Sequence, residues 1–261
     1  MPSPDLKKIL DNKTLGSSEL TEMLNDYFLS IKENNSKIKK SILQVKEKLG
    51  HFENVNSYLS DLNATLKKND QKELNRFLKN YSDNEQDKIQ LIFDRLYPEV
   101  NKMKSVITLS RSGTVIGVLK LWCKKNKKLN VVVCESRPEL EGRSTAMELI
   151  KAEIKVELIT DAMMGIYIQK VDCALIGADS ILKNGNVVNK VGSRALALLS
   201  ENAGKPFYVV SAKSKLSKNN TCRNKEENPD EIWKNKIKNL QIRNIYFEVI
   251  EKKLITKVFT D

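Results

Sequence analysis

The stretch ALIGADSILKNGNVVNKVGSRALA, residues 174–197, decides the fold. It starts in an apolar strand predicted over 171–177, passes the carboxylate of Asp179, and turns at Gly185-Asn186. The run Asn189-Lys190-Val191-Gly192-Ser193 then opens a helix, where a glycine lets backbone N–H groups approach an anion and the helix dipole adds about 0.3–1 kcal/mol. The pattern predicts a carboxylate beside an anion site. An ordinary Asp and Asn turn has the same composition, so this stretch alone leaves a plain loop open.

Beyond Tyr97-Pro98, short β-branched runs alternate with helical patterns. Strands are predicted over 105–109, 130–134, 155–159, 171–177, 206–211, 245–250 and 255–259, and helices from Thr114, Ser144, Ala162 and Ser193. Such alternation of apolar strands and helices is typical of a mainly parallel sheet that is covered on both faces. We therefore predict an α/β fold with a Rossmann-like domain over residues 99–261.

Residues 1–98 show a different periodicity. From Glu19 to Tyr97 the apolar residues recur at helical spacing, which predicts an N-terminal all-helical bundle of four or five antiparallel helices. Asn84 is placed to cap the last of these helices, and His51 to lie at a helix end. We see no catalytic constellation in this region.

The chain is basic, with 45 Lys+Arg against 33 Asp+Glu in 261 residues, a net charge of +12 and a pI near 9.4. Such an excess favours anionic ligands, nucleic acid or an acidic protein partner. The one compact run, Lys124-Lys125-Asn126-Lys127-Lys128, is interpreted as the solvated end of a helix. No aromatic platform or RNA-binding module accompanies the charge, so RNA binding is the least favoured hypothesis.

The four cysteines include no CxxC pair, and the single histidine is distant in sequence, so we expect neither a metal site nor a disulfide framework. Cys134 and Cys173 lie in apolar strand patterns and are predicted to be core residues. No run approaches 18 apolar residues, and the start MPSPDLKKIL lacks a signal-peptide core. We therefore expect a cytoplasmic protein with no membrane contact.

The residues that follow the predicted strands are unusually polar. Parallel sheets bind ligands in the crevice at the carboxyl ends of their strands. An Arg fork or a Lys charge there suits phosphate, and a carboxylate accepts from sugar hydroxyls or moves a proton. We predict a pocket for a phosphorylated polyol, without a cofactor; a GxGxxG dinucleotide fingerprint is missing. The candidate ligand-binding residues are Ser110, Arg111, Ser112, Thr114, Arg137, Asp179, Asn189, Lys190 and Gly192.

Several runs in this half are similar to a known family. They are TLSRSGTV at 108–115, CESRPELEGR at 134–143, TDAMMG at 160–165, IGADSILKNGNVVNKVGS at 176–193, KPFYVVSAKSKL at 205–216 and ITKVFTD at 255–261. The chain resembles the alpha, beta and delta regulatory subunits of translation initiation factor 2B and their archaeal relatives. The same family holds isomerases that act on ribose 1,5-bisphosphate and methylthioribose 1-phosphate. Asp179, Arg137 and the run GSSEL at 16–20 place it nearest the alpha or archaeal members.

The resemblance implies a helical N-terminal part, a Rossmann-like C-terminal domain, and a homodimer or higher oligomer formed through the latter. In relatives the chain typically continues for a few turns beyond the position of Asp261. The family's isomerases carry a cysteine after the first strand that works with the aspartate of the GAD motif. Ser110 stands at the cysteine position and Asp179 is retained.

A serine alkoxide is far harder to form than a thiolate, and the isomerases' RGxxxIG-like run is missing. The resemblance therefore implies a non-catalytic regulatory subunit that binds a phosphorylated sugar or nucleotide. Such a subunit would act in translation initiation with initiation factor 2, other factor 2B-type subunits, or both, in a guanine-nucleotide exchange complex. The alternative is a sugar-phosphate aldose-ketose isomerase that uses Asp179 and Ser110.

Overall fold

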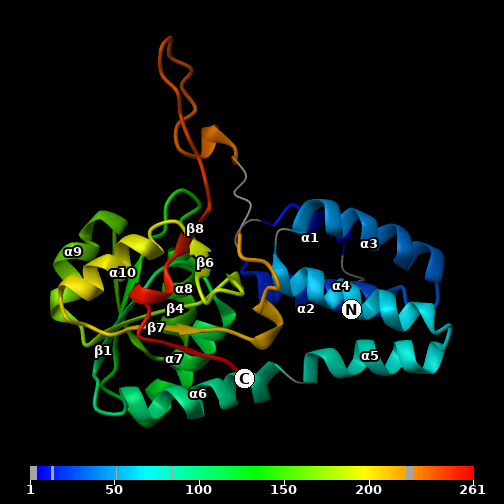
Figure 1. Ribbon diagram of the computed structural model, residues 1–261, viewed down its shortest axis with the longest axis horizontal. Coiled ribbons are helices and arrows are strands. Elements are labelled where there is room, and N and C mark those ends of the chain that lie inside the picture. The colour runs from blue at the N-terminus through cyan, green and yellow to red at the C-terminus, as the bar shows by residue number, and fades with distance from the viewer. Residues whose placement is uncertain (1–4, 13–14, 51, 84, 222–225) are drawn as a thin grey trace.

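A computed structural model describes residues 5–12, 15–50, 52–83, 85–221 and 226–261. An all-helical part lies beside an α/β part, which confirms the predicted fold class (Figure 1). The expectations for His51 and Asn84 fall outside the described residues. Within the described ranges, no helix combines the length and the apolar character that a membrane crossing requires.

The helical part is held by one core to which five helices contribute. Phe28, Leu62 and Leu78 are fully buried in it, and Tyr58 stacks on Phe77 with ring centroids 5.8 Å apart. The first helix, only five residues long, is too short to show a periodic pattern in the sequence. The five helices are α1 (Leu6–Leu10), α2 (Ser17–Ser30), α3 (Asn35–Leu49), α4 (Glu53–Lys67) and α5 (Gln71–Asp83).

The next helix, α6 (Glu85–Val100), packs on the sheet rather than on the helical core. Its residues Ile92, Phe93 and Leu96 share a core with Trp122 of α7 (Gly113–Lys125). The expected boundary at residue 98 therefore lies inside a helix. The change of sequence pattern at Tyr97-Pro98 coincides with the last turn of α6. The core of the helical part ends with α5, and the core under the sheet begins with α6.

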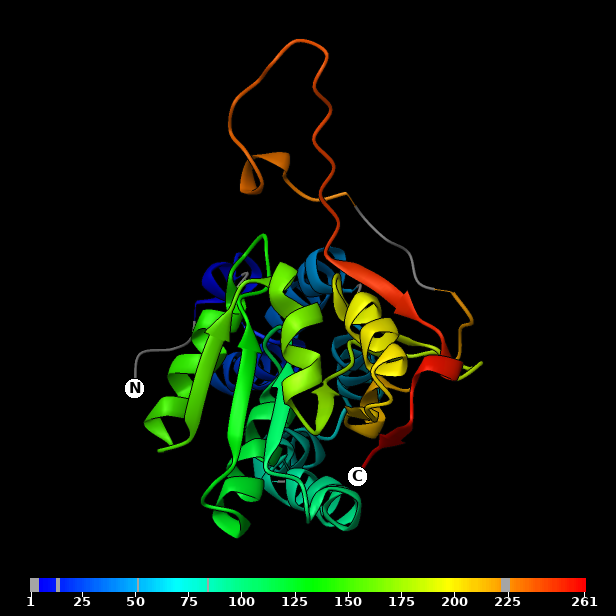
Figure 2. The same cartoon turned by 90° about the vertical axis from the view of Figure 1, so that its left-hand side faces the viewer.

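The main sheet has six parallel strands in the order β3-β2-β1-β4-β7-β9. Alternate residues of each strand enter two cores. Val131 and Val133 pack under α6, α7 and α8 (Glu141–Lys151), whereas Val132 and Cys134 face the side of α10 (Ser193–Asn202). Both faces are covered, as predicted (Figure 2). The strands are β1 (Ser105–Thr108), β2 (Asn130–Cys134), β3 (Lys155–Ile159), β4 (Cys173–Ile176), β7 (Phe207–Val210) and β9 (Lys257–Phe259).

Three predicted elements differ from the structure. The helix expected from Ala162 is broken into two 3-10 turns around α9 (Met164–Tyr167), and α8 begins three residues before Ser144. The strand expected over 245–250 forms β8 (Phe247–Ile250), which leaves the main sheet. It joins a small antiparallel sheet with the hairpin of β5 (Ser180–Ile181) and β6 (Val187–Lys190), where Val188 pairs with Val249.

Residues 226–245 form an arm that projects from the α/β part, drawn in orange and red in Figures 1 and 2. A bridge between Glu226 and Ile245 closes its base. The side chains of Ile232, Trp233, Ile237 and Leu240 are between 41% and 49% exposed on it. The arm therefore presents apolar surface to solvent.

Candidate functional site

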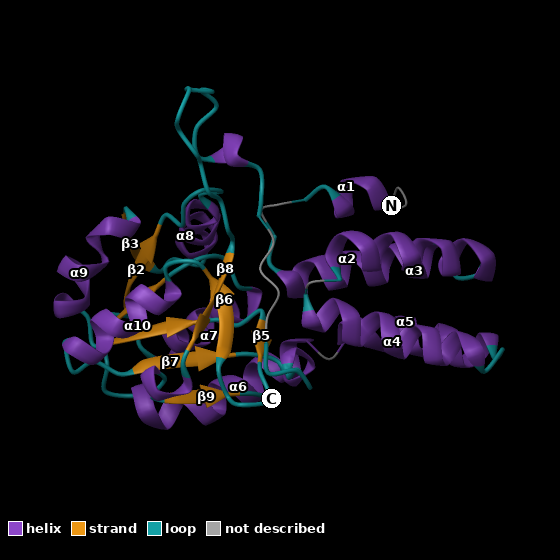
Figure 3. Cartoon of the chain, turned by 45° about the horizontal axis from the view of Figure 1, so that its top comes forward, coloured by secondary structure: helices purple, strands orange, loops and turns teal. Residues whose placement is uncertain are grey.

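A cavity of about 470 Å³ lies where the carboxyl ends of the sheet strands meet the helical part. Figure 3 shows the strands, β7 most clearly, running towards those helices. The volume is in the range of small-molecule sites. The helical part contributes Gly16, Ser17, Leu20, Lys48, Leu49 and Phe52 to the wall. The α/β part contributes Ser110, Arg111, Glu139, Glu141, Asp179, Lys190, Tyr246 and Phe247.

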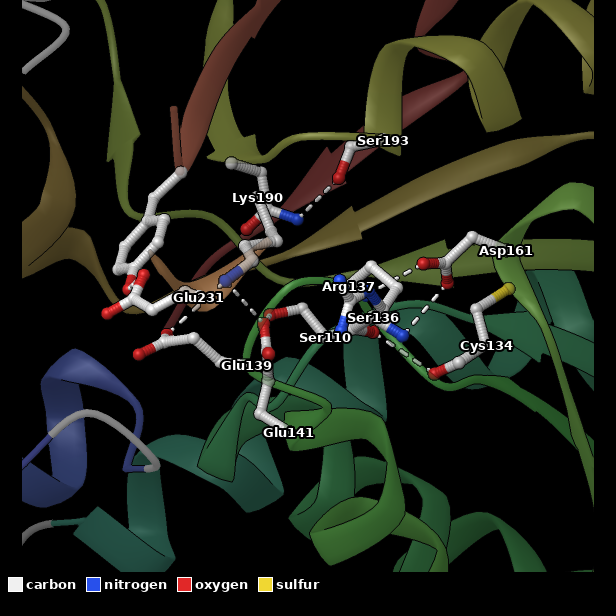
Figure 4. A network of polar contacts seen from close by, with 12 residues as sticks. Ser110, Cys134, Ser136, Arg137, Glu139, Glu141, Asp161, Lys190, Ser193 and Glu231 are labelled. Carbon is white, nitrogen blue, oxygen red and sulfur yellow. Dashed lines mark hydrogen bonds and ion pairs between the residues drawn. The ribbon is translucent and has the colours of Figure 1, made fainter. Parts of the chain in front are cut away.

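Lys190, at the end of β6, holds the centre of the polar wall (Figure 4). Its Nζ lies 3.0 Å from Glu141 Oε1 and 3.4 Å from Glu139 Oε2, and 4.3 Å from the centroid of the Tyr246 ring. The Lys190 side chain is only 4% exposed, and those of the two glutamates 10% or less. Buried charges persist when each is paired, and removing one partner of such a cluster costs about 3–5 kcal/mol.

The pKa of Glu139 reflects both its burial and its charged neighbours. Burial raises this pKa and Glu141 adds to the rise, whereas Lys190 and the Tyr246 hydroxyl oppose it; the net direction is upward. Burial and the carboxylates of Glu231 and Glu139 also raise the pKa of Tyr246, so its hydroxyl stays a donor. Tyr246 Oη donates to Glu231 at the root of the arm. The hydroxyl of Tyr246 therefore links the cavity wall to the arm.

Ser110 is fixed as a donor to the same cluster. Its Oγ donates to Glu141 Oε1 at 2.9 Å, and its backbone N–H donates to Ser136 Oγ at 2.7 Å. Ser110, Ser136 and Leu140 all have positive φ, at 69°, 65° and 63°. A left-handed backbone is uncommon in non-glycine residues. These three residues lie in the loops after β1 and β2, which supply polar side chains to the cavity wall.

Arg111 connects the two parts of the molecule. Its Nε donates to Glu19 Oε2 of α2 at 3.1 Å, one Nη pairs with Glu19 Oε1, and the same Nη lies 2.9 Å from Glu148 Oε2 of α8. The backbones come close at the same place, because a Cβ on Gly16 would lie 3.1 Å from the Arg111 carbonyl oxygen. Arg111 lines the cavity as predicted for a site residue, but its charge already has two carboxylate partners.

Asp179 lies on the cavity wall near Lys190 and Lys215. Burial raises the pKa of Asp179; the two lysines oppose the rise and Glu141 adds to it. Ser112 and Asn189 line a smaller hollow beside it, together with Arg111 and Asp179. Asn189 Nδ2 also donates to Ser193 Oγ at 2.9 Å.

Three predicted ligand residues do not line the main cavity or the smaller hollow. Thr114 is buried in α7. The side chain of Arg137 is exposed and donates to the Ile232 carbonyl of the arm at 3.3 Å, while its backbone N–H donates to Asp161. Asp161 also binds the N–H of Ser136, so this carboxylate shapes the loop after β2.

Gly192 is the third of these residues, and its surroundings correct the expected anion site. Its N–H and that of Arg194 donate to Glu248 Oε1 at 2.7 and 2.9 Å, and φ of Gly192 is 101°. The start of α10 therefore does bind an anion, as the helix dipole favours, but that anion is the chain's own carboxylate on β8.

Cys134 is a core residue, as its strand pattern predicts. Burial raises the pKa of its thiol to about 12, so the thiol is protonated at neutral pH. Cys123 and Cys173 are also buried free thiols. Within the described residues, no three His, Cys, Asp or Glu side chains are grouped to hold a metal ion.

The cavity wall also holds charged and aromatic residues that were not among the predicted ligand residues: Asp11, Lys48, Phe52, Glu139, Glu141, Glu227, Tyr246 and Phe247. Glu141 follows the same loop as Arg137 and could have been included for its place after β2. Lys48 lies on α3 in a helical region, where nothing in the pattern distinguishes it from other exposed lysines.

The fold and the cavity define a class: a two-part α/β protein whose small-molecule site lies at the carboxyl edge of a parallel sheet and is closed by a helical domain. Residues 6–261 match the profile of the initiation factor 2 subunit family. The chain belongs to this family.

Its relatives carry two kinds of name. The chain is 36% identical over 161 residues to methylthioribose-1-phosphate isomerase 1 of Pseudothermotoga lettingae, covering 57% of this chain and 46% of that protein. It is 32% identical over 156 residues to a translation initiation factor eIF-2B subunit 2-like protein of Pyrococcus furiosus, covering 60% and 55%. It therefore spans about half the length of these relatives. The crystal structure of the Pyrococcus horikoshii OT3 translation initiation factor eIF-2B has the same fold, with a TM-score of 0.82 at 24% identity over 98% of this chain and 93% of that one.

The raised pKa of Asp179 predicts a pH-dependent effect of Asp179→Asn. A carboxyl whose folded pKa exceeds its unfolded value, about 4, adds stability below that value and loses it as pH rises through the folded pKa. The variant, which cannot ionise, should therefore become more stable relative to the wild type as pH rises from about 3 to 7. Urea unfolding across this range measures the difference.

Asp61→Asn, at an exposed site on α4, is the matched control, and its difference from the wild type should not grow in this way. A difference for Asp179→Asn that stays constant, or shrinks, as pH rises would contradict a desolvated Asp179.

Proposed function

We propose that this chain is a non-catalytic regulatory subunit of the initiation factor 2B type that binds a phosphorylated sugar or nucleotide in the cavity. The observation that carries the proposal is the setting of Ser110, which by the resemblance takes the position of the isomerases' cysteine. Its hydroxyl is committed to Glu141, and Glu141 in turn pairs with Lys190.

The donors and acceptors of the wall suit a polyol with a phosphate. The exposed Lys48 is the cation that supplies a point charge for phosphate, because Glu19 and Glu148 already hold Arg111, and Glu139 and Glu141 already hold Lys190. Glu141 Oε2 is buried without a hydrogen-bond partner among the described residues. A buried acceptor of this kind favours a ligand that brings a donor, and a sugar hydroxyl is such a donor.

The same geometry argues against turnover. An aldose-ketose isomerisation moves a proton between neighbouring carbons and needs a group that both gives and accepts it. The Ser110 hydroxyl is a much weaker acid than a thiol, and its neighbour Glu141 is already paired with Lys190. Cys134, on the next strand, is buried and protonated.

A sugar-phosphate isomerase is the second candidate, and the raised pKa of Asp179 is the observation that favours it. In that case Asp179 would carry the proton, with Ser110 or another group as its partner. Asp179→Asn would then abolish turnover while ligand binding is kept.

We expect assembly through the arm with a second copy of the chain or with related subunits, and through it a role with initiation factor 2 in guanine-nucleotide exchange. The support is the exposed apolar surface of residues 226–245, since large apolar side chains gathered at one site mark interaction surfaces. Trp233, 48% exposed, is the largest of them.

The binding proposal is tested with Lys48→Ala, against Arg137→Ala as a control that also removes one exposed positive charge. Lys48 lines the cavity and Arg137 does not. Loss of one charge-assisted hydrogen bond should weaken binding of ribose 1,5-bisphosphate about 10- to 100-fold in calorimetry, and Arg137→Ala should leave it unchanged. Equal losses in both variants would place the ligand elsewhere.

The absence of catalysis is tested on the same samples. The wild type should bind ribose 1,5-bisphosphate or methylthioribose 1-phosphate without converting either, as followed by NMR of the sugar protons. Turnover at about 1–1000 per second would overturn the non-catalytic proposal in favour of the isomerase.

The assembly proposal predicts that Trp233→Ser weakens self-association. Removing an aromatic anchor from an interface typically costs 2 kcal/mol or more, which is roughly a 30-fold rise in the dissociation constant. Sedimentation velocity over a concentration series measures it. Leu43→Ser, at an apolar site on α3 that is more exposed than Trp233, is the control, and a wild-type chain that stays monomeric throughout would refute self-association through the arm.

A further inference from the structure

The positive charge of this chain is segregated. Residues 1–100 carry 16 Lys+Arg and 16 Asp+Glu, so the whole excess of 12 lies in residues 101–261. The cavity does not account for it, because the cations on its α/β wall, Arg111 and Lys190, are each paired with two glutamates. The remaining charge therefore lies elsewhere on the α/β part.

The topology gathers much of this charge at one edge of the main sheet. Five neighbouring strands run parallel, so their first residues share the edge opposite the cavity, and the helices that return to them end there. Lysines stand within three residues of each of these strand starts, or at the ends of α7 and α8. We call this set the amino-edge face: Lys102, Lys104, Lys124, Lys125, Lys127, Lys128, Lys151, Lys155, Lys170 and Lys205.

These lysine side chains are accessible to an external ligand. All are exposed except Lys205, which is partly exposed, and none forms a side-chain ion pair among the described residues. Acidic side chains at the same edge are fewer, namely Glu99, Glu153, Glu157, Asp172 and Glu201, and Glu99 is paired with Lys257. Asp172 is occupied locally, because its Oδ2 accepts from the backbone N–H groups of Lys104 and Ser105 and from Ser105 Oγ.

The shape of the face points to an extended polyanion. Five strands about 4.8 Å apart spread the lysines over about 19 Å, and a nucleic-acid duplex presents about eleven phosphates over that length of its axis. Aromatic stacking positions are scarce: Trp122 is fully buried, and Tyr167 lies under Lys170 at 4.9 Å. Lysine without aromatic platforms suits contacts to a backbone rather than to splayed single-stranded bases.

We propose that the amino-edge face binds the phosphate backbone of double-stranded RNA, independently of sequence and of the ligand cavity. The run at 124–128, interpreted from the sequence as a solvated helix end, is one section of this face. Binding is electrostatic, so it depends on how many lysines meet phosphates and on salt.

The test uses the full chain and a fluorescent RNA duplex of about 20 base pairs, followed by anisotropy at several salt concentrations. The variant in which Lys124, Lys125, Lys127 and Lys128 are all changed to Gln should bind at least tenfold more weakly. The slope of log K against log salt should become less steep by about 3. The matched control changes Lys37, Lys39, Lys40 and Lys46 of α3 to Gln, an equal loss of charge from exposed sites on the helical part.

A second variant, with Lys102, Lys104, Lys155 and Lys170 changed to Gln, should lose affinity comparably, because these lysines belong to other strands of the same face. If the α3 control lost as much affinity for the duplex, the effect would follow from net charge alone, and the proposal would be overturned. So would competition by poly-glutamate as strong as by unlabelled duplex, which would indicate an acidic protein partner. Absence of measurable binding at about 50 mM salt would also overturn it.

Discussion

The buried pairing of Lys190 with Glu139 and Glu141 is the interaction on which the rest of the site depends. It joins four separate pieces of chain: the end of β6, the loop after β2, the first turn of α8, and Tyr246 at the root of the arm. Ser110 adds the loop after β1 through Glu141. Because each charge is almost fully buried, none of these pieces can shift without leaving an unpaired charge behind.

A second ionic contact lets the helical part form one wall of the cavity. The guanidinium of Arg111 reaches Glu19 on α2 and Glu148 on α8, and so holds the helical part against the sheet. The first turn of α2 then supplies Gly16 and Ser17 to the cavity wall. Arg111 was predicted to bind ligand. Its two ion pairs show that it also holds the helical wall of the cavity in place.

The sequence predicts the parallel sheet well because its strands are buried on both faces and appear as continuous apolar runs. Local patterns could not place β8, since a strand of the same composition fits either sheet and only its pairing with β6 decides. Similarly, the glycine before α10 correctly indicated an anion site, but the anion is Glu248, 56 residues further along the chain. Arg137 and Lys48 show the same limit: whether a charged side chain faces the cavity depends on tertiary contacts, and both look alike in the sequence.

One fold in this family serves proteins named as isomerases and proteins named as initiation factor subunits, so function depends on a few side chains in the cavity. In this chain the cavity combines a fixed serine, a buried carboxylate with a vacant acceptor, and two lysines. The most direct test is a crystal structure of the chain with ribose 1,5-bisphosphate. The account predicts unconverted ligand in the cavity, with phosphate at Lys48 and a sugar hydroxyl at Glu141; an isomerised product, or ligand bound outside this cavity, would contradict it.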